Sequence, residues 1–315
     1  MVLSADTPNL LGIDIGGTKT AIVVGSPDGK IVERFQFASL AERGLEPMLS
    51  DIENHAQEMR DRHPGIAAIG VSVGGPVDAE AGMVLGPPNL PGWDAVPLAT
   101  RLAARFGVPT RIEHDAKACA LAEWRYGAGR GTRDMVFLTL GTGLGAGIIA
   151  GGRILRGRGN LAGEVGHWRV HEDGPLIYGK RGSYEGWASG AGLPALARFL
   201  KPGQFDDLKD TAELGARARS GDIAAIAVIS EAGRALGRGL ALLVDLLAPE
   251  AIVLGNLASR LGPEFLDAAA RELAGNALPA LAANCRILHC ELGDHIGDMA
   301  ALTVAAETLQ EEQTR

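Results

Sequence analysis

Two short segments that contain glycine and threonine have the residue types that suit phosphate binding. Asp14–Lys19 (Asp-Ile-Gly-Gly-Thr-Lys) and Gly141–Gly147 (Gly-Thr-Gly-Leu-Gly-Ala-Gly) each follow an apolar stretch. Backbone amides in such turns can donate to phosphate oxygens, and Asp14 could hold Mg²⁺ through water. Each turn alone is also an ordinary hairpin turn. Two together favour phosphate binding, because a triphosphate needs donors from both walls of a cleft. The residues assigned to phosphate are Asp14, Gly16, Gly17, Thr18, Lys19, Gly141, Thr142 and Gly143.

Other segments carry carboxylates or imidazoles beside glycine or at the end of a strand. Asp115 follows the strand-like stretch Thr110–His114, where an aspartate is also a good N-cap for the next helix. The segment Gly163–His167 (Gly-Glu-Val-Gly-His) contains Glu164, which fits an exposed surface residue, and His167, which fits a histidine bonded within its loop. Residue type alone therefore assigns no function to them.

The elements that must position these residues follow from the hydrophobic pattern. Leu10–Gly25 predicts a hairpin around the first turn, and strand-then-helix patterns occur twice along the chain. This indicates two α/β domains with a cleft between them, residues 1–115 plus 299–315 and residues 116–298. Residues 157–192 have no clear period and are predicted to be loops. The other predicted strands are 31–37, 66–73, 110–114, 135–140, 148–154, 251–254 and 287–292, and the predicted helices are 46–60, 98–106, 115–124, 193–200, 212–220, 223–247, 264–278 and 299–311.

The composition excludes several classes of protein. Glycine makes up 44 of the 315 residues, about twice its ordinary usage, without the period of collagen. Residues 127–192 hold 19 of these glycines, so we expect this region to carry a site. A net charge of −8 and 4% aromatic residues disfavour nucleic acid as a partner. Three cysteines without a Cys-x-x-Cys pair, and a start that lacks a signal peptide or membrane span, predict a cytoplasmic protein with reduced thiols and no membrane partner.

The order of five motifs resembles that of a known family. The two turns and the stretch Pro249–Gly255 are similar to the phosphate-1, phosphate-2 and adenosine segments of the sugar kinase/heat-shock ATPase/actin fold. Gly163–His167 and Glu185–Gly190 are similar to motifs of the ROK family of bacterial sugar kinases and repressors. The resemblance covers about residues 10 to 305. It implies a two-domain actin-like (ribonuclease H-like) ATPase fold of the α/β class, with an interdomain cleft.

The resemblance also implies roles for individual residues. Asp115 matches the general base that takes a proton from the sugar hydroxyl that attacks the γ-phosphate, and the implied cofactors are ATP and Mg²⁺. Gly255 and Asn256 would lie beside the nucleotide. The residues expected to contact the sugar are Gly75, Asn89, His114, Glu164, His167 and Glu185.

Two departures from the family pattern are visible. Many members hold zinc with the histidine of the Gly163–His167 segment and three cysteines, but Leu176, Tyr178 and Ser183 occupy the corresponding positions here. Because thiolate ligands are missing, we expect no structural zinc, and we expect Tyr178 or apolar packing to shape this loop. The second departure is His114, where sugar kinases of the family usually have asparagine, so the identity of the sugar stays open.

The function that this pattern implies is ATP-dependent phosphorylation of a hexose, glucose by default, at the 6-hydroxyl, in carbohydrate metabolism and glycolysis. Fructose, mannose or an N-acetylated amino sugar are alternative substrates, and polyphosphate or another nucleotide is an alternative donor. A ROK transcriptional regulator is disfavoured, since only 13 residues precede Asp14 and no helix-turn-helix is expected there. A non-catalytic sugar-binding relative is disfavoured by the intact Asp115. The expected partners are hexose, ATP and a second copy in a homodimer.

Overall fold

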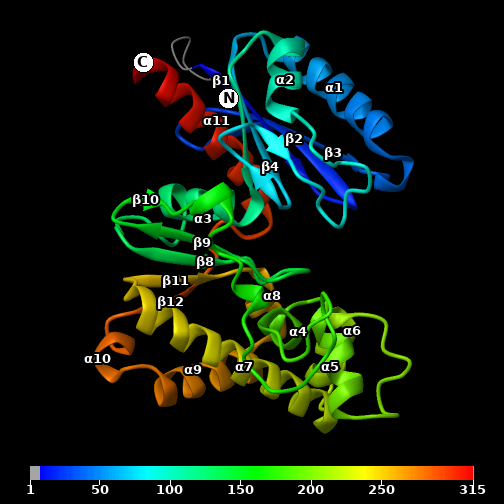
Figure 1. The fold of residues 1–315 in the computed structure, drawn as a ribbon, viewed down its shortest axis with the longest axis vertical. Coiled ribbons are helices and arrows are strands. Elements are labelled where there is room, and N and C mark those ends of the chain that lie inside the picture. Colours follow the sequence, from blue (N-terminus) through cyan, green and yellow to red (C-terminus); the bar gives the residue numbers. More distant parts are fainter. Residues whose placement is uncertain (1–7, 315) are drawn as a thin grey trace. The chain divides into compact units, whose positions relative to one another are not determined.

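The computed structural model describes residues 8–314, which form two α/β units (Figure 1). The first unit comprises residues 8–126, 154–162 and 294–314, and the second comprises residues 127–153 and 163–293. The sequence-based division assigns residues 116–126 and 154–162 to the larger domain, whereas here these segments pack with the first unit. The predicted cleft concerns the relation between the two units and stays a prediction.

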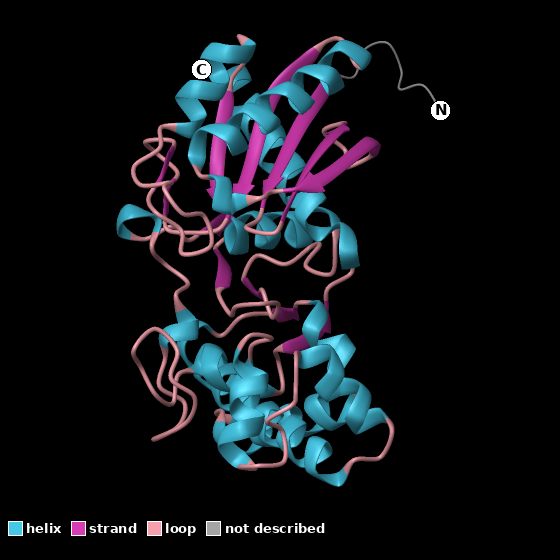
Figure 2. Ribbon diagram, turned by 90° about the vertical axis from the view of Figure 1, so that its right-hand side faces the viewer, coloured by secondary structure: helices cyan, strands magenta, loops and turns pink. Residues whose placement is uncertain are grey.

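The first unit is built on a five-stranded sheet in the order β3-β2-β1-β4-β7. Figure 2 draws the strands in magenta and the helices beside them in cyan. Its first three strands are antiparallel, which confirms the predicted hairpin, and β1, β4 and β7 run parallel. The carboxyl ends of these three parallel strands therefore meet at one edge of the sheet. The bounds are β1 (Asn9–Ile15), β2 (Lys19–Gly25), β3 (Ile31–Ala38), β4 (Ile66–Val73) and β7 (Thr110–His114), with a small separate pair β5 (Val77–Asp78) and β6 (Met83–Val84).

Helices cover both faces of this sheet (Figure 1). Alternate residues of β1 such as Leu11 and Ile13 pack in one core with α1 (Leu45–Arg62) and α2 (Leu98–Phe106). On the opposite face α11 (Ile296–Thr314) packs against β1, β4 and α3 (Asp115–Tyr126). Gly70 permits this close approach, because a Cβ there would lie 2.1 Å from the Ala305 nitrogen. Three short 3-10 helices also contribute to the first unit: η1 (Ala41–Arg43), η2 (Arg158–Asn160) and η4 (Gly293–His295), of which Asp294 and His295 lie in this unit.

The second unit repeats the same strand order, β10-β9-β8-β11-β12. Its hairpin β8–β9 is antiparallel, and β8, β11 and β12 are parallel. The predicted strand 148–154 is wrong as one element, because Gly151 and Gly152 both have positive φ and turn the chain between β9 and β10. The bounds are β8 (Met135–Leu138), β9 (Ala146–Ala150), β10 (Arg153–Ile154), β11 (Ala251–Leu254) and β12 (Arg286–His289).

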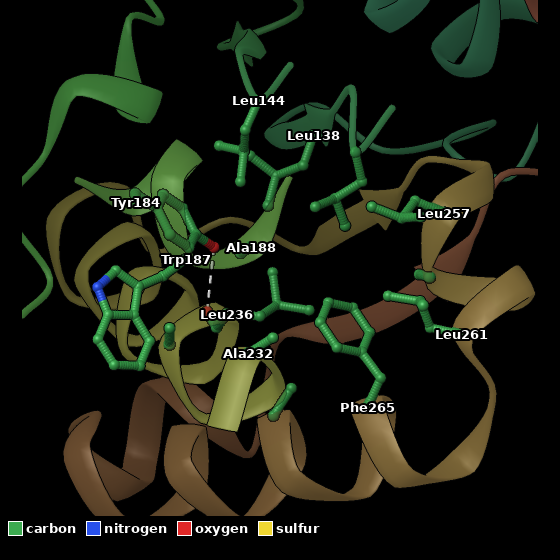
Figure 3. Close-up of a cluster of buried hydrophobic side chains, with 14 of the residues drawn as sticks. Leu138, Leu144, Tyr184, Trp187, Ala188, Ala232, Leu236, Leu257, Leu261 and Phe265 are labelled. Atoms are coloured by element: carbon green, nitrogen blue, oxygen red, sulfur yellow. Dashed lines mark hydrogen bonds between the residues drawn. The ribbon is translucent and has the colours of Figure 1, made fainter. Parts of the chain in front are cut away.

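Helices fill the rest of the second unit around one apolar core (Figure 3). In that core the hydroxyl of buried Tyr184 donates to the Leu236 carbonyl at 3.0 Å. The prediction of loops alone over 157–192 is wrong, because elements of three to five residues are too short to show a hydrophobic period. The elements are η3 (Val165–His167), α4 (Tyr184–Ala188), α5 (Gly192–Leu200), α6 (Thr211–Arg219), α7 (Ile223–Leu247), α8 (Asn256–Leu261), α9 (Pro263–Asn276) and α10 (Pro279–Ala282).

Between residues 8 and 314, none of the helices is both long and apolar enough to cross a membrane.

Candidate active site

The turn between β1 and β2 holds the first predicted phosphate segment. The Gly16 N–H donates to the Lys19 carbonyl at 3.1 Å. Ser39 stabilises the turn with two further hydrogen bonds: its hydroxyl donates to the Gly16 carbonyl and its N–H donates to the Thr18 carbonyl. Ser39 is fully buried, and no pattern in the sequence predicted this role. The Thr18 and Lys19 side chains are exposed, so they are available to a ligand.

Three further predicted residues lie around this turn at the carboxyl edge of the sheet. A Cβ on Gly17 would come within 2.7 Å of the Asn89 carbonyl oxygen, so Asn89, a predicted sugar contact, touches the phosphate turn. A Cβ on Gly75, just after β4, would come within 2.6 Å of Nε2 of His114. Gly17 and Gly75 therefore leave room for neighbouring residues of the same unit.

Asp115 begins α3 at the same edge. Its carboxylate accepts a hydrogen bond from the Ala116 N–H at 2.6 Å, and its side chain is 49% exposed. Nδ1 of His114 lies 3.2 Å from both the Ala116 nitrogen and Oδ1 of Asp115, so the imidazole ring packs directly against the carboxylate. The partial positive charge at a helix N-terminus stabilises a carboxylate at this position. Asp115 thus presents a fixed but accessible oxygen acceptor.

Asp14, the last polar residue of β1, has a perturbed acidity. Burial raises the pKa of Asp14 to about 6, and repulsion by the carboxylates of Asp115 and Asp298 adds to the increase. The Ser72 hydroxyl and the Lys19 ammonium favour the charged form and offset part of it. Asp14 pairs in register with Ser72 of β4, one residue before these two parallel strands end. Such a carboxylate is charged at neutral pH only at an energetic cost, and a cation nearby would lower that cost.

In the second unit, the turn after β8 carries the second predicted phosphate segment. The Gly190 N–H donates to the Gly141 carbonyl at 2.8 Å, and Thr142 is exposed. The Glu185 carboxylate accepts the Leu144 N–H at 2.9 Å, and a Cβ on Gly143 would lie 3.0 Å from the same oxygen. Glu185 of α4 therefore lies directly against the phosphate turn.

The Gly163–His167 segment packs on this turn as well. A Cβ on Gly166 would come within 2.2 Å of the Leu144 carbonyl oxygen, so the segment requires glycine there. Glu164 and His167 are both exposed. The ring of Tyr178 stacks on His167 with centroids 5.5 Å apart, and burial, together with the charges of Glu185 and Glu164, raises the pKa of Tyr178. Glu164, His167, Glu185 and Tyr178 thus form one cluster.

The loop around Tyr178 has its own set of internal contacts. Lys180 Nζ donates to the His167 carbonyl at 2.7 Å, and Ser183 caps α4 by accepting the Gly186 N–H. Leu176 is 62% exposed. Over residues 8–314 the structure contains no group of three or more His, Cys, Asp or Glu side chains that could hold a metal ion. The absence of zinc itself stays a prediction.

The predicted nucleotide residues Gly255 and Asn256 follow β11 beside the end of β8. A Cβ on Gly255 would come within 2.1 Å of the Thr139 carbonyl oxygen, and the Asn256 side chain donates to the Gly293 carbonyl at 2.9 Å. Both residues therefore already have a role in packing this unit, and a role toward a nucleotide stays a prediction.

Each unit thus brings its own share of the predicted residues together. The first unit gathers those at the ends of β1, β4 and β7, namely Asp14, Gly16, Gly17, Thr18, Lys19, Gly75, Asn89, His114 and Asp115. The second gathers those around the turn after β8, namely Gly141, Thr142, Gly143, Glu164, His167, Glu185, Gly255 and Asn256.

Comparison with known proteins identifies the family. The model of the ROK family matches residues 10–308. The chain belongs to the ROK family. A solved ROK family glucokinase from Streptomyces griseus, in complex with glucose and AMPPNP, is 33% identical, with a TM-score of 0.77 over 95% of this chain and 99% of that one. The α/β, actin-like (ribonuclease H-like) ATPase fold predicted for this ROK chain is confirmed.

Characterised relatives carry different activities. The glucokinase of Thermotoga maritima is 31% identical over 95% of this ROK chain and 98% of its own length. The N-acetylmannosamine kinase of Shigella flexneri is 35% identical over 74% of this chain and 77% of its own. The xylose repressor of Caldicellulosiruptor bescii is 30% identical over 84% of this chain and 70% of its own.

Proposed function

We propose that this ROK protein is an ATP-dependent sugar kinase that phosphorylates a hexose at its 6-hydroxyl, with glucose as the first substrate to test. The observation that carries the proposal is the half-exposed Asp115 carboxylate, which lies at the same edge of the sheet as the Gly16–Lys19 turn. The similarity to glucokinases supports phosphorylation of a hexose.

In this proposal each group has one task. Asp115 accepts the proton of the attacking hydroxyl while its own carboxylate is held by the Ala116 N–H. The other sugar hydroxyls are bound by Asn89, His114, Glu164, His167 and Glu185. His114 stands where sugar kinases of the family usually have asparagine, and an imidazole reaches a hydroxyl at a different distance and angle from an amide.

Phosphoryl transfer requires mainly positioning and neutralisation of charge. The phosphates of ATP would be held by the amides of the two glycine turns with Thr18, Lys19 and Thr142. The single carboxylate of Asp14 fits Mg²⁺, which keeps several waters and usually takes one or two protein carboxylates. When bound, Mg²⁺ would supply neutralisation of the phosphate charge.

The test is an assay of sugar phosphate formation over glucose, fructose, mannose and N-acetylmannosamine, with ATP or polyphosphate as donor. Asp115→Ala should abolish phosphorylation and leave the sugar Kd within about tenfold, because the base acts on the transferred proton. The control Asp206→Ala removes a carboxylate from an exposed loop and should retain full turnover. Near-normal turnover in Asp115→Ala would refute the assignment.

Two alternatives have specific support. The similarity to an N-acetylmannosamine kinase supports an amino sugar as substrate, and the sugar panel separates it from glucose. The similarity to a xylose repressor supports a sugar-responsive regulator. A regulator would bind a sugar without phosphorylating it, so the same assay distinguishes it. A cytoplasmic location, a role in glycolysis and a homodimer stay predictions.

A further inference from the structure

A buried carboxylate lies two residues before the proposed base. Glu113 of β7 is 2% exposed. Its Oε2 accepts Nε and Nη2 of Arg156 at 3.1 and 3.0 Å, and its Oε1 accepts the His114 N–H and the Asn160 side-chain amide, each at 2.9 Å. A buried charge is costly unless it is paired and hydrogen-bonded, and four hydrogen bonds satisfy this one. The whole arrangement lies within the first unit.

Asn160 connects the two sides of Asp115. Its side chain donates to Glu113, and its carbonyl accepts a hydrogen bond from Lys117 Nζ at 2.9 Å. Lys117 is 1% exposed and lies in the first turn of α3, two residues after Asp115. Asn160 is itself buried and has a positive φ of 60°, which asparagine tolerates better than most residues. Asn160 is therefore hydrogen-bonded to a residue before Asp115 and to a residue after it.

These contacts join segments that are far apart in the sequence. Glu113 and Asn160 are 47 positions apart, and residues 154–162 return to the first unit only for nine residues. A charged network built around the turn that carries Asp115 restricts the direction of that turn, because hydrogen bonds to ionised groups are stronger than those between neutral groups.

We propose that Glu113 is a positioning residue for phosphoryl transfer. With Arg156, Asn160 and Lys117 it forms the Glu113 network, which fixes the β7–α3 turn so that Asp115 points toward the hydroxyl that it deprotonates. This inference rests on the proposed function of Asp115. A small misplacement of a base affects the chemical step more than substrate binding, so the network acts on kcat rather than on KM.

The test compares Glu113→Gln and Asn160→Ala with the wild-type protein. Glu113→Gln keeps the shape of the side chain but removes its charge and turns one acceptor into a donor. We expect each variant to lower kcat at least about tenfold and to change the KM for the sugar less than about threefold. The double variant should be little worse than the poorer single one, because both break one unit.

The matched control is Glu53→Gln, which breaks another partly buried glutamate–arginine pair of the first unit. Glu53 of α1 accepts Nε of Arg101 at 2.6 Å and takes no part in the Glu113 network. This control should leave kcat unchanged. An equal loss of kcat in Glu53→Gln, or a kcat within twofold of wild type in both test variants, would overturn the proposal.

Hydrogen exchange gives a readout that does not depend on catalysis. The amides of residues 113–120 should exchange at least about fivefold faster in Glu113→Gln and Asn160→Ala, and unchanged in Glu53→Gln. If the wild-type protein phosphorylates none of the sugars, the proposed function fails and exchange alone decides whether the network orders the turn. Unchanged exchange in the test variants would overturn the inference in either case.

Discussion

Asp14→Asn should stabilise the protein at neutral pH while it abolishes the proposed activity. The asparagine keeps the shape of the side chain at the end of β1 but cannot carry the charge that burial and the neighbouring carboxylates of Asp115 and Asp298 oppose. The gain in stability and the loss of turnover have the same origin, since the variant removes the charge proposed to attract a cation.

The sign and size follow from proton linkage. The pKa of Asp14 is about 6 in the folded protein against 3.8 for an ordinary aspartate, so the folded state holds the proton more tightly than the unfolded state. The stability that this provides is present below about pH 4 and is lost as the pH rises through about 6. Two pKa units correspond to about 3 kcal/mol. Because Asp14 keeps some exposure and water screens its charge, we expect about 1–2 kcal/mol.

The assay is urea unfolding without nucleotide or Mg²⁺, at about pH 8 and about pH 4.5. Relative to wild type, Asp14→Asn should gain about 1–2 kcal/mol of unfolding free energy at the higher pH and much less at the lower one. Asp61→Asn removes the same charge from an exposed position of α1 and should change stability by less than about 0.5 kcal/mol at both. A variant that is less stable than wild type at pH 8, or a gain independent of pH, would refute the reasoning.

Three further expectations concern packing, ligand and metal. Gly70→Ala forces a Cβ against Ala305 of α11 and should cost about 3 kcal/mol or more in thermal unfolding, whereas Gly275→Ala, with open space inside α9, should stabilise by about 0.5 kcal/mol. Gly141→Ala should leave stability within about 0.5 kcal/mol but raise the KM for ATP about tenfold, and an unchanged KM would contradict a phosphate role. Elemental analysis should find far less than one zinc per chain, and a full equivalent would overturn that prediction.

Much of the fold was accessible from the sequence because its signals are local. Apolar alternation and glycine turns predicted both hairpins, and periodicity predicted the long helix Ile223–Leu247. The short elements were missed for the opposite reason. α4 has five residues and α8 has six, which is too few for one face to repeat, and the surrounding core decides their conformation.

The candidate site, like the fold, was predictable from local sequence signals but not from contacts between distant segments. Motifs predicted which residues gather at each sheet edge, since a strand followed by a turn delivers its end residues to one place. The Glu113 network could not be predicted, because it consists of buried polar contacts between segments 47 residues apart. The stacking of Tyr178 on His167 depends likewise on where two loops meet. In both cases the residue types are ordinary, and only their contacts distinguish them.

The glycines of the predicted site are of two kinds, and the sequence does not separate them. At Gly17, Gly163 and Gly255 a Cβ would come within 2.7 Å of a carbonyl oxygen of the protein itself, so packing would require glycine there without any ligand. A Cβ on Gly141 would meet, among the described residues other than its chain neighbours, only the Thr139 carbonyl oxygen at 3.6 Å, so an alanine would fit. A glycine that packing does not require needs another reason, and close approach of a ligand to the backbone is one. The phosphate hypothesis therefore depends more on Gly141 than on the glycines that first suggested it.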